Sequence, residues 1–208
     1  MGLLSSSISL TQYKVQGQLD DPVMETVRKG LQRNAISDID NDPDAIVSGW
    51  TSFKHPFAPD FSGSDLMIGT DFLFSLRIDK KTIPSKVLKK HYLLEMNKQL
   101  EKTGREFLSK NEKRDIKDHV VQVLSLRIPA TPNIYDIVWR YEEGLLWCFT
   151  NLKAANEELE TLFNRSFKLG LIRLFPFTTC ELTCGLSDVE RDSVSTLRPT
   201  QWMAYSND

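Results

Sequence analysis

The sequence predicts an α+β protein with a largely antiparallel sheet, packed helices and an inserted, projecting antiparallel helical hairpin. Strand-like alternation occurs in two separate halves of the chain, and two long segments with helical spacing lie between them. Few connections between strands are long enough for parallel crossovers, which favours antiparallel pairing. We expect residues 1–80 and 130–186 to form an α/β body, residues 81–129 the hairpin, and residues 187–208 an irregular tail.

The first half opens with a strand and a helix. Residues 8–15 are short, β-branched and partly alternating, which predicts a strand. Pro22 is a first-turn proline after two aspartates, and the spacing of Val23, Val27 and Leu31 predicts the helix that follows.

The clearest strand of the first half comes after a long polar stretch. Residues 37–64 are rich in Asp, Pro, Gly and Ser and predict mostly loop, with a short strand at 46–53. From Leu66 to Ile78 every second residue is apolar or threonine, so this segment predicts one continuous strand with one buried face.

Two helices with narrow apolar stripes make up the predicted hairpin. The first begins around Pro84, and Gly104 ends it as the residue best suited to a left-handed cap. The second begins at Ser109, which forms a capping box with Glu112. Two helices of about 18 residues give a hairpin of about 27 Å. Each helix therefore buries one seam and leaves most of its surface in water.

The second half returns to period two. Residues 135–141 and 145–150 predict a strand, a turn at Gly144 and a returning strand, followed by a helix over 152–169. Residues 171–184 predict one or two further strands interrupted at Pro176.

The three cysteines have no metal-finger spacing. On one strand, Cys180 and Cys184 would lie roughly 13 Å apart, which is too far for a disulfide. Together with Cys148 they are expected to be core thiols in a reducing compartment, and we expect the protein in the cytoplasm.

Charge is strongly polarised along the chain. Residues 80–119 contain twelve Lys or Arg against six carboxylates, whereas the rest of the chain contains 14 basic and 22 acidic residues. The hairpin is therefore basic and the remainder acidic. Such a distribution favours a polyanionic partner at the hairpin, and the alternative is a hairpin whose lysines only keep it in solution.

Other chemistry is weakly supported by the sequence. The acidic run that starts at Asp38 lacks the glycine and glutamate that an EF-hand requires. A metal-dependent nuclease would need convergent carboxylates, for which the candidates are Asp60, Asp65, Asp71, Glu142 and Glu143. No phosphate-binding or nucleophile-elbow motif occurs.

The histidines complete this search for chemistry. His91 and His119 could face each other across the hairpin, but histidines among surface lysines are more often solvated than metal ligands. We expect no catalytic residue, metal, cofactor or small-molecule substrate.

We predict that exposed cations of the hairpin bind DNA phosphates without sequence preference. The predicted DNA-binding residues are Lys86, Lys89, Lys90, Lys98, Lys102, Arg105, Lys110, Lys113, Arg114 and Lys117. The alternative is a protein-interaction module that kept the fold and lost DNA binding, and a metal-dependent nuclease is a third hypothesis.

The chain resembles RdgC, a family of bacterial recombination-associated DNA-binding proteins, sometimes described as exonucleases. The resemblance spans about residues 8–185 and follows the order of elements. It rests on Gly49-Trp50, the strand end 77–84, the Lys-rich helices with 113–118, Trp139, the turn at Gly144 and the helix 153–169.

This resemblance implies a horseshoe-shaped subunit that pairs with a second subunit into a ring around duplex DNA and limits access of the RecA recombinase. It also implies a homodimer through the hairpin tips, with Phe107 and Leu108 as contacts, and a nucleoid location. Family members continue for a further domain after the segment matched by residues 200–202, and this chain ends at Asp208. Without that domain, the tips are the expected contact between subunits. No membrane partner is expected.

Overall fold

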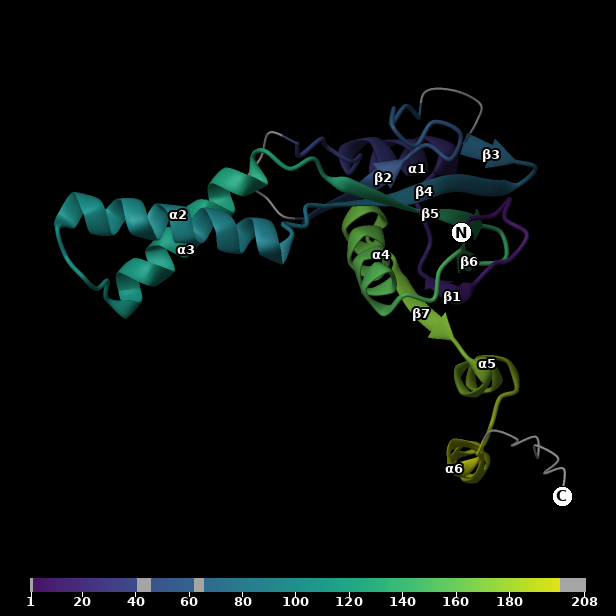
Figure 1. Ribbon diagram of the computed structural model, residues 1–208. Helices are drawn as coiled ribbons and strands as arrows, with labels where there is room; N and C mark the ends of the chain where they lie inside the picture. Colours follow the sequence, from purple (N-terminus) through teal and green to yellow (C-terminus); the bar gives the residue numbers. More distant parts are fainter. Residues whose placement is uncertain (1, 41–45, 62–65, 199–208) are drawn as a thin grey trace, which may run out of the picture.

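The computed structural model describes residues 2–40, 46–61 and 66–198. It shows an α+β fold built on one curled antiparallel sheet (Figure 1). Within the described residues, the strands of this sheet are β1 (Thr11–Gln16), β2 (Ile46–Thr51), β3 (Met67–Ile68), β4 (Asp71–Lys80), β5 (Thr131–Arg140), β6 (Leu145–Cys148) and β7 (Gly170–Leu174). The predicted fold class is confirmed.

The strand order brings the two halves of the chain together. It runs β2-β4-β5-β6-β1-β7, with β3 paired to β4, and every paired strand is antiparallel to its neighbour. β4 and β5 are the longest partners, in register from Phe72 opposite Trp139 to Lys80 opposite Thr131. The polypeptide therefore leaves the sheet at Lys80 and re-enters it on the adjacent strand.

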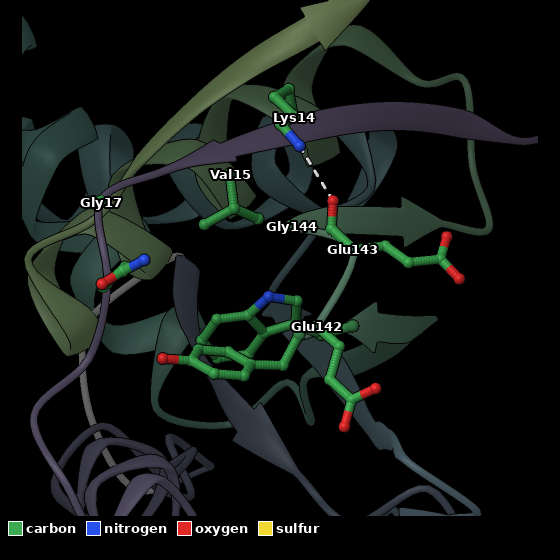
Figure 2. Close-up of a pocket in the computed structure, with 9 residues that line it drawn as sticks. Lys14, Val15, Gly17, Glu142, Glu143 and Gly144 are labelled. Carbon is green, nitrogen blue, oxygen red and sulfur yellow. Dashed lines mark hydrogen bonds between the residues drawn. The ribbon is translucent and has the colours of Figure 1, made fainter.

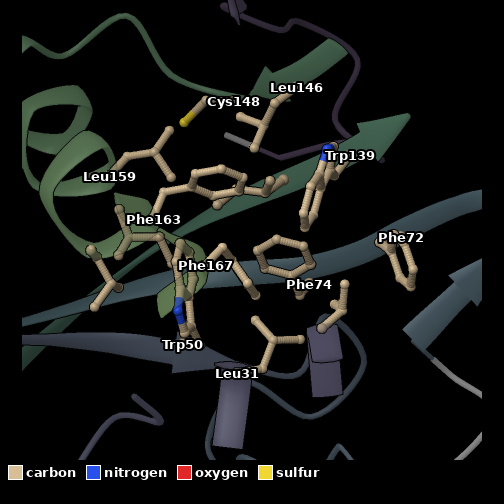
Figure 3. Packing of buried hydrophobic residues seen from close by; sticks show 14 of the residues in the cluster. Leu31, Trp50, Phe72, Phe74, Trp139, Leu146, Cys148, Leu159, Phe163 and Phe167 are labelled. Atoms are coloured by element: carbon tan, nitrogen blue, oxygen red, sulfur yellow. The ribbon is translucent and has the colours of Figure 1, made fainter. Parts of the chain in front are cut away.

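Helices α1 (Val23–Arg33) and α4 (Lys153–Phe167) pack against each other and against β2. Side chains of the sheet and of α4 form an aromatic core between them. In this core the Trp139 ring lies 5.0 Å from Phe163 and 5.2 Å from Phe167 (Figure 3). Trp50 packs edge-on against Phe74 at 5.2 Å. The body therefore contains the main hydrophobic core of the chain.

Helices α2 (Ser85–Thr103) and α3 (Lys110–Ser125) pack against each other and extend away from the sheet (Figure 1). No residue of α2 is fully buried, and α3 buries only Val120, Leu124 and Ser125. We call residues 81–129 the hairpin throughout.

The predicted continuous strand over 66–78 is wrong at its start. A turn at Gly69, whose φ is +63°, separates β3 from β4. The prediction of one buried face is also incomplete, because Leu73 and Ser75 on the intervening positions of β4 are buried as well. Period-two patterns identify strands well but reveal little about coverage of the second face.

The prediction of strand structure over 171–184 is correct for the residues before Pro176 and wrong for those after it. Only β7 is a strand, and Pro176 begins helix α5 (Pro176–Thr183), where the Phe175 backbone N–H donates to Thr178 Oγ1 at 2.9 Å. A proline that interrupts a strand pattern also suits the first position of a helix.

The expectation of core thiols holds for Cys148 only. Cys180 lies on α5 and is half-buried, and Cys184 caps the C-terminal end of that helix and is exposed, so the spacing argument based on a strand was wrong. Burial raises the pKa of the Cys148 thiol to about 12.

The predicted irregular tail contains a helix, α6 (Asp188–Thr196), which starts with a Ser187–Glu190 capping box. Residues 199–208 lie outside the described residues. Among the helices that the structure describes, none combines the length and apolarity that a membrane span requires.

Candidate nucleic-acid interface

A buried lysine fixes the base of the hairpin. Lys81 follows β4 directly, and its ammonium donates to the backbone carbonyls of Asp40 at 3.0 Å and Ser125 at 2.8 Å. Asp40 Oδ1 in turn accepts a hydrogen bond from the Ala130 backbone N–H at 2.8 Å. The start and the end of the hairpin are thus tied to one loop of the body, and Lys81 serves structure rather than ligand binding.

The tip of the hairpin is a tight connection with two caps. Gly104 ends α2 in the left-handed region, with φ of +64°. Ser109 begins α3, because its side chain accepts from the Glu112 backbone N–H while the Glu112 carboxylate accepts from the Ser109 N–H. These hydrogen bonds hold the pKa of Glu112 below its usual value. The predicted capping box is confirmed.

All ten predicted DNA-binding cations are exposed. Two of them form ion pairs with described residues, Lys98 with Glu95 at 3.6 Å and Arg105 with Glu112 at 3.2 Å. Surface pairs of this kind are weak, and a polyanion competes with them easily. The hairpin therefore presents its cations to solvent rather than to its own carboxylates.

Four exposed cations of α3 lie along one side of the helix. Lys110, Lys113, Arg114 and Lys117 follow the spacing i, i+3, i+4, i+7, which places them along one stripe. Asp115 falls on the other flank, whereas Asp118 follows Arg114 by four residues and borders the stripe. The stripe is about 10 Å long at a rise of 1.5 Å per residue, and it begins at the tip.

The lysines on α2 divide between the two sides of the hairpin. A cavity between the helices marks one side, because His91 and Glu95 of α2 and His119 and Val123 of α3 line it. At about 100° per residue, Lys86 and Lys89 lie far around α2 from that cavity. On α3, Val120 and Leu124 also line the cavity, and they follow Lys113 and Lys117 by seven residues, so the α3 stripe is not set apart from it.

Seven of the ten exposed cations remain when Lys98 and Lys102, which lie on the cavity side of α2, and the paired Arg105 are set aside. We call this set the basic face: Lys86, Lys89, Lys90, Lys110, Lys113, Arg114 and Lys117.

Of the two residues predicted as subunit contacts at the tip, only Phe107 is exposed. Leu108 is 6% exposed and packs within its own chain, so it is not a surface residue, and that part of the prediction is wrong. Phe107 is 80% exposed. From the sequence alone, a buried apolar residue near a bend cannot be distinguished from an exposed one.

His91 and His119 both line the interhelical cavity of about 270 Å³. The described part of the chain contains no group of three or more His, Cys, Asp or Glu side chains that could hold a metal ion. Among the described residues, the lining of this cavity is mixed polar and apolar and contains no such group.

Two of the carboxylates considered for a nuclease are paired with one arginine. Asp71 pairs with Arg140 at 3.7 Å, and Glu143 pairs with the same guanidinium. Asp65, with Asp42 and Asp44 of the acidic run, lies outside the described residues.

The body has a separate open pocket of about 340 Å³ beside the β5–β6 turn (Figure 2). There the Lys14 ammonium donates to the Glu143 backbone carbonyl at 2.9 Å. Trp139 Nε1 is buried without a hydrogen-bond partner among the described residues, and Trp139 also lines this pocket. The cavity offers hydrogen-bond donors but no paired nucleophile and base.

Comparison with known proteins adds no relative. No protein-family model matches the chain, and no curated protein matches it.

Proposed function

We propose that this protein binds double-stranded DNA without sequence preference, through the basic face of the hairpin, and performs no catalysis. The observation that carries the proposal is the row of four exposed cations on one side of α3, Lys110, Lys113, Arg114 and Lys117. Lysines that merely keep a helix in solution need no such alignment. A one-sided row of exposed cations suits a row of phosphates.

The mode of binding follows from the side-chain chemistry. Flexible ammonium groups contact phosphates as point charges and do not read base edges, so affinity depends on salt and hardly on sequence. The acidic remainder of the chain repels DNA, which orients the hairpin towards it.

The test is a binding titration of labelled duplex DNA at several salt concentrations. Each phosphate neutralised contributes about −0.9 to the log–log salt slope, so engagement of the whole basic face gives a slope near −6. Two duplexes of different sequence should bind alike. Absence of binding at low salt would reject the proposal.

A matched pair of variants locates the site. Reversal of Lys86, Lys89, Lys113 and Lys117 to Glu should remove detectable binding at moderate salt, and circular dichroism should show an intact fold. Reversal of Lys86 and Lys89 alone changes the same charge as reversal of Lys98 and Lys102, and the second pair, which lies on the cavity side of α2, should weaken binding less. Equal losses in both variants would show that charge alone, rather than the basic face, determines binding.

The wider role we propose is that of an RdgC-type protein, which acts at the nucleoid of the cytoplasm and limits access of RecA to DNA. This proposal is supported by the antiparallel body with a long helical insertion between adjacent strands. A strand-exchange assay would test it, since the wild-type protein should slow RecA loading and the four-lysine reversal should not.

Pairing of two subunits through the hairpin tips is a separate proposal, and it now rests on Phe107 alone. Light scattering of the wild-type protein and of Phe107→Ala tests it. A dimer that becomes a monomer in the variant would support it.

A second candidate function is a protein-interaction module, and the C-terminal helices favour it. The structure shows α5 contacting β7 and α6, with Val189 and Leu197 at 76% and 73% exposed. Capture of a protein partner that survives high salt, in a protein that fails to bind DNA, would favour this function over the first.

A further inference from the structure

Phe107 is an aromatic ring presented at the end of a projecting arm. It lies between the Gly104 turn and the Ser109 cap, and 80% of it is exposed. Its neighbours Glu106, Ser109 and Lys110 are also exposed. The ring therefore stands alone among polar residues at the tip.

The loop around the ring is held in place. Leu108, the next residue, is buried, and Ser109 is tied to Glu112 by two hydrogen bonds of 2.7 and 3.2 Å. Because Leu108 points into the hairpin, the adjacent ring is directed outward by a fixed backbone. Such an anchored presentation lowers the entropy that a partner must overcome on binding.

The surroundings of Phe107 fit a nucleic acid better than a second copy of the chain. A stable subunit contact buries about 800 Å² per partner around several apolar residues, and this tip offers one ring. Two tips would also bring the cations of both α3 stripes close together, at a cost in repulsion. For DNA the same cations are attractive.

We propose that Phe107 stacks on a nucleobase when the basic face holds the DNA backbone. This proposal rests on the proposed function and adds a preferred substrate class. One aromatic stack is weaker than the cost of separating two base pairs of an intact duplex. The ring therefore favours DNA in which a base is already unstacked, such as a one-nucleotide gap, a bulge or a junction with a single strand.

The experiment compares two duplexes of equal length and charge, one intact and one with an unpaired 2-aminopurine in its centre. The wild-type protein should bind the bulged duplex about tenfold more tightly and change the 2-aminopurine fluorescence on binding. Phe107→Ala should lose both the preference and the fluorescence change, but keep its salt slope on the intact duplex.

Two further variants make the result specific. Phe57 is also a surface phenylalanine, 67% exposed on the body, so Phe57→Ala should behave as wild type. Phe107→Trp keeps an aromatic ring and should retain the preference for the bulge, with its own fluorescence quenched by DNA.

The outcomes separate the two proposals. No binding of either duplex by the wild-type protein would overturn the proposed function and this inference with it. Salt-dependent binding with the same bulge preference and fluorescence change in wild type and Phe107→Ala would overturn the stacking role alone. A loss of dimer in Phe107→Ala with unchanged 2-aminopurine fluorescence would assign the ring to a subunit contact instead.

Discussion

The body and the hairpin are stabilised in different ways. In the body, Trp139 contacts Phe72, Tyr141, Phe163 and Phe167, with ring centroids 5.0 to 5.7 Å apart. In the hairpin, α2 buries no residue fully, and the two helices share a narrow seam. A seam of this kind leaves most of each helix surface free to carry charge.

This difference separates stability from the proposed binding. A cation inside the aromatic core would cost several kcal/mol, whereas a cation on an exposed helix costs almost nothing. The hairpin can thus carry eleven exposed Lys and Arg side chains because the body supplies the packing. Changes in one region should leave the property of the other region intact.

Removal of the hairpin is the strongest test of this separation. Lys80 and Thr131 are paired neighbours on β4 and β5, so a two-residue Asn-Gly turn can replace residues 81–130. We expect the shortened protein to keep its sheet, as measured by circular dichroism, and to lose DNA affinity by at least about 100-fold. Retention of DNA binding would assign the site to the body.

Trp139→Ala should have the opposite effect. It removes the ring at the centre of the aromatic core and should lower the free energy of unfolding by about 3–5 kcal/mol, because the cavity cannot collapse fully. Urea unfolding measures the change.

The exposed ring of Phe57 provides the control for this core substitution. Phe57 is 67% exposed and lies under the Arg77 guanidinium at 5.4 Å, so Phe57→Ala should cost about 1 kcal/mol or less. An equal loss in both variants would contradict the placement of the core.

Lys81→Ala tests the joint between the two regions. The substitution leaves the carbonyls of Asp40 and Ser125 without their donor and should cost about 1–3 kcal/mol. Hydrogen exchange should accelerate at the C-terminal end of α3 more than in β5. Since Lys81 is buried, DNA affinity should change little, and a large loss would mean that the joint orients the basic face.

The sequence predicts local order well where one physical signal dominates. The capping box at Ser109, the left-handed Gly104 and the alternation of β5 are short-range features, and the structure contains each of them.

The remaining features depend on tertiary contacts. Lys81 looked like one more hairpin cation, and only its burial against Asp40 and Ser125 reveals its structural role. Leu108 looked like a surface contact because a bend usually exposes its residues. The residues that line the cavity between α2 and α3 could not be predicted without knowing which faces of the two helices meet.

The smallest expected effect concerns the cap at the tip. Because Glu112 has a lowered pKa, its charged form stabilises the fold at pH values above its unfolded pKa, and this stabilisation is lost as the pH falls through the lower folded pKa. Acidification should thus loosen the first turn of α3 while the aromatic core stays intact. Ser109→Ala should accelerate amide exchange in that turn about fivefold at neutral pH and return the pKa of Glu112 towards its ordinary value, as an NMR titration would show. If Phe107 depends on this cap for its orientation, the same variant should also reduce the preference for bulged DNA without changing the salt slope on intact duplex. A variant with a looser cap and full bulge preference would show that the buried Leu108 alone is enough to present the ring.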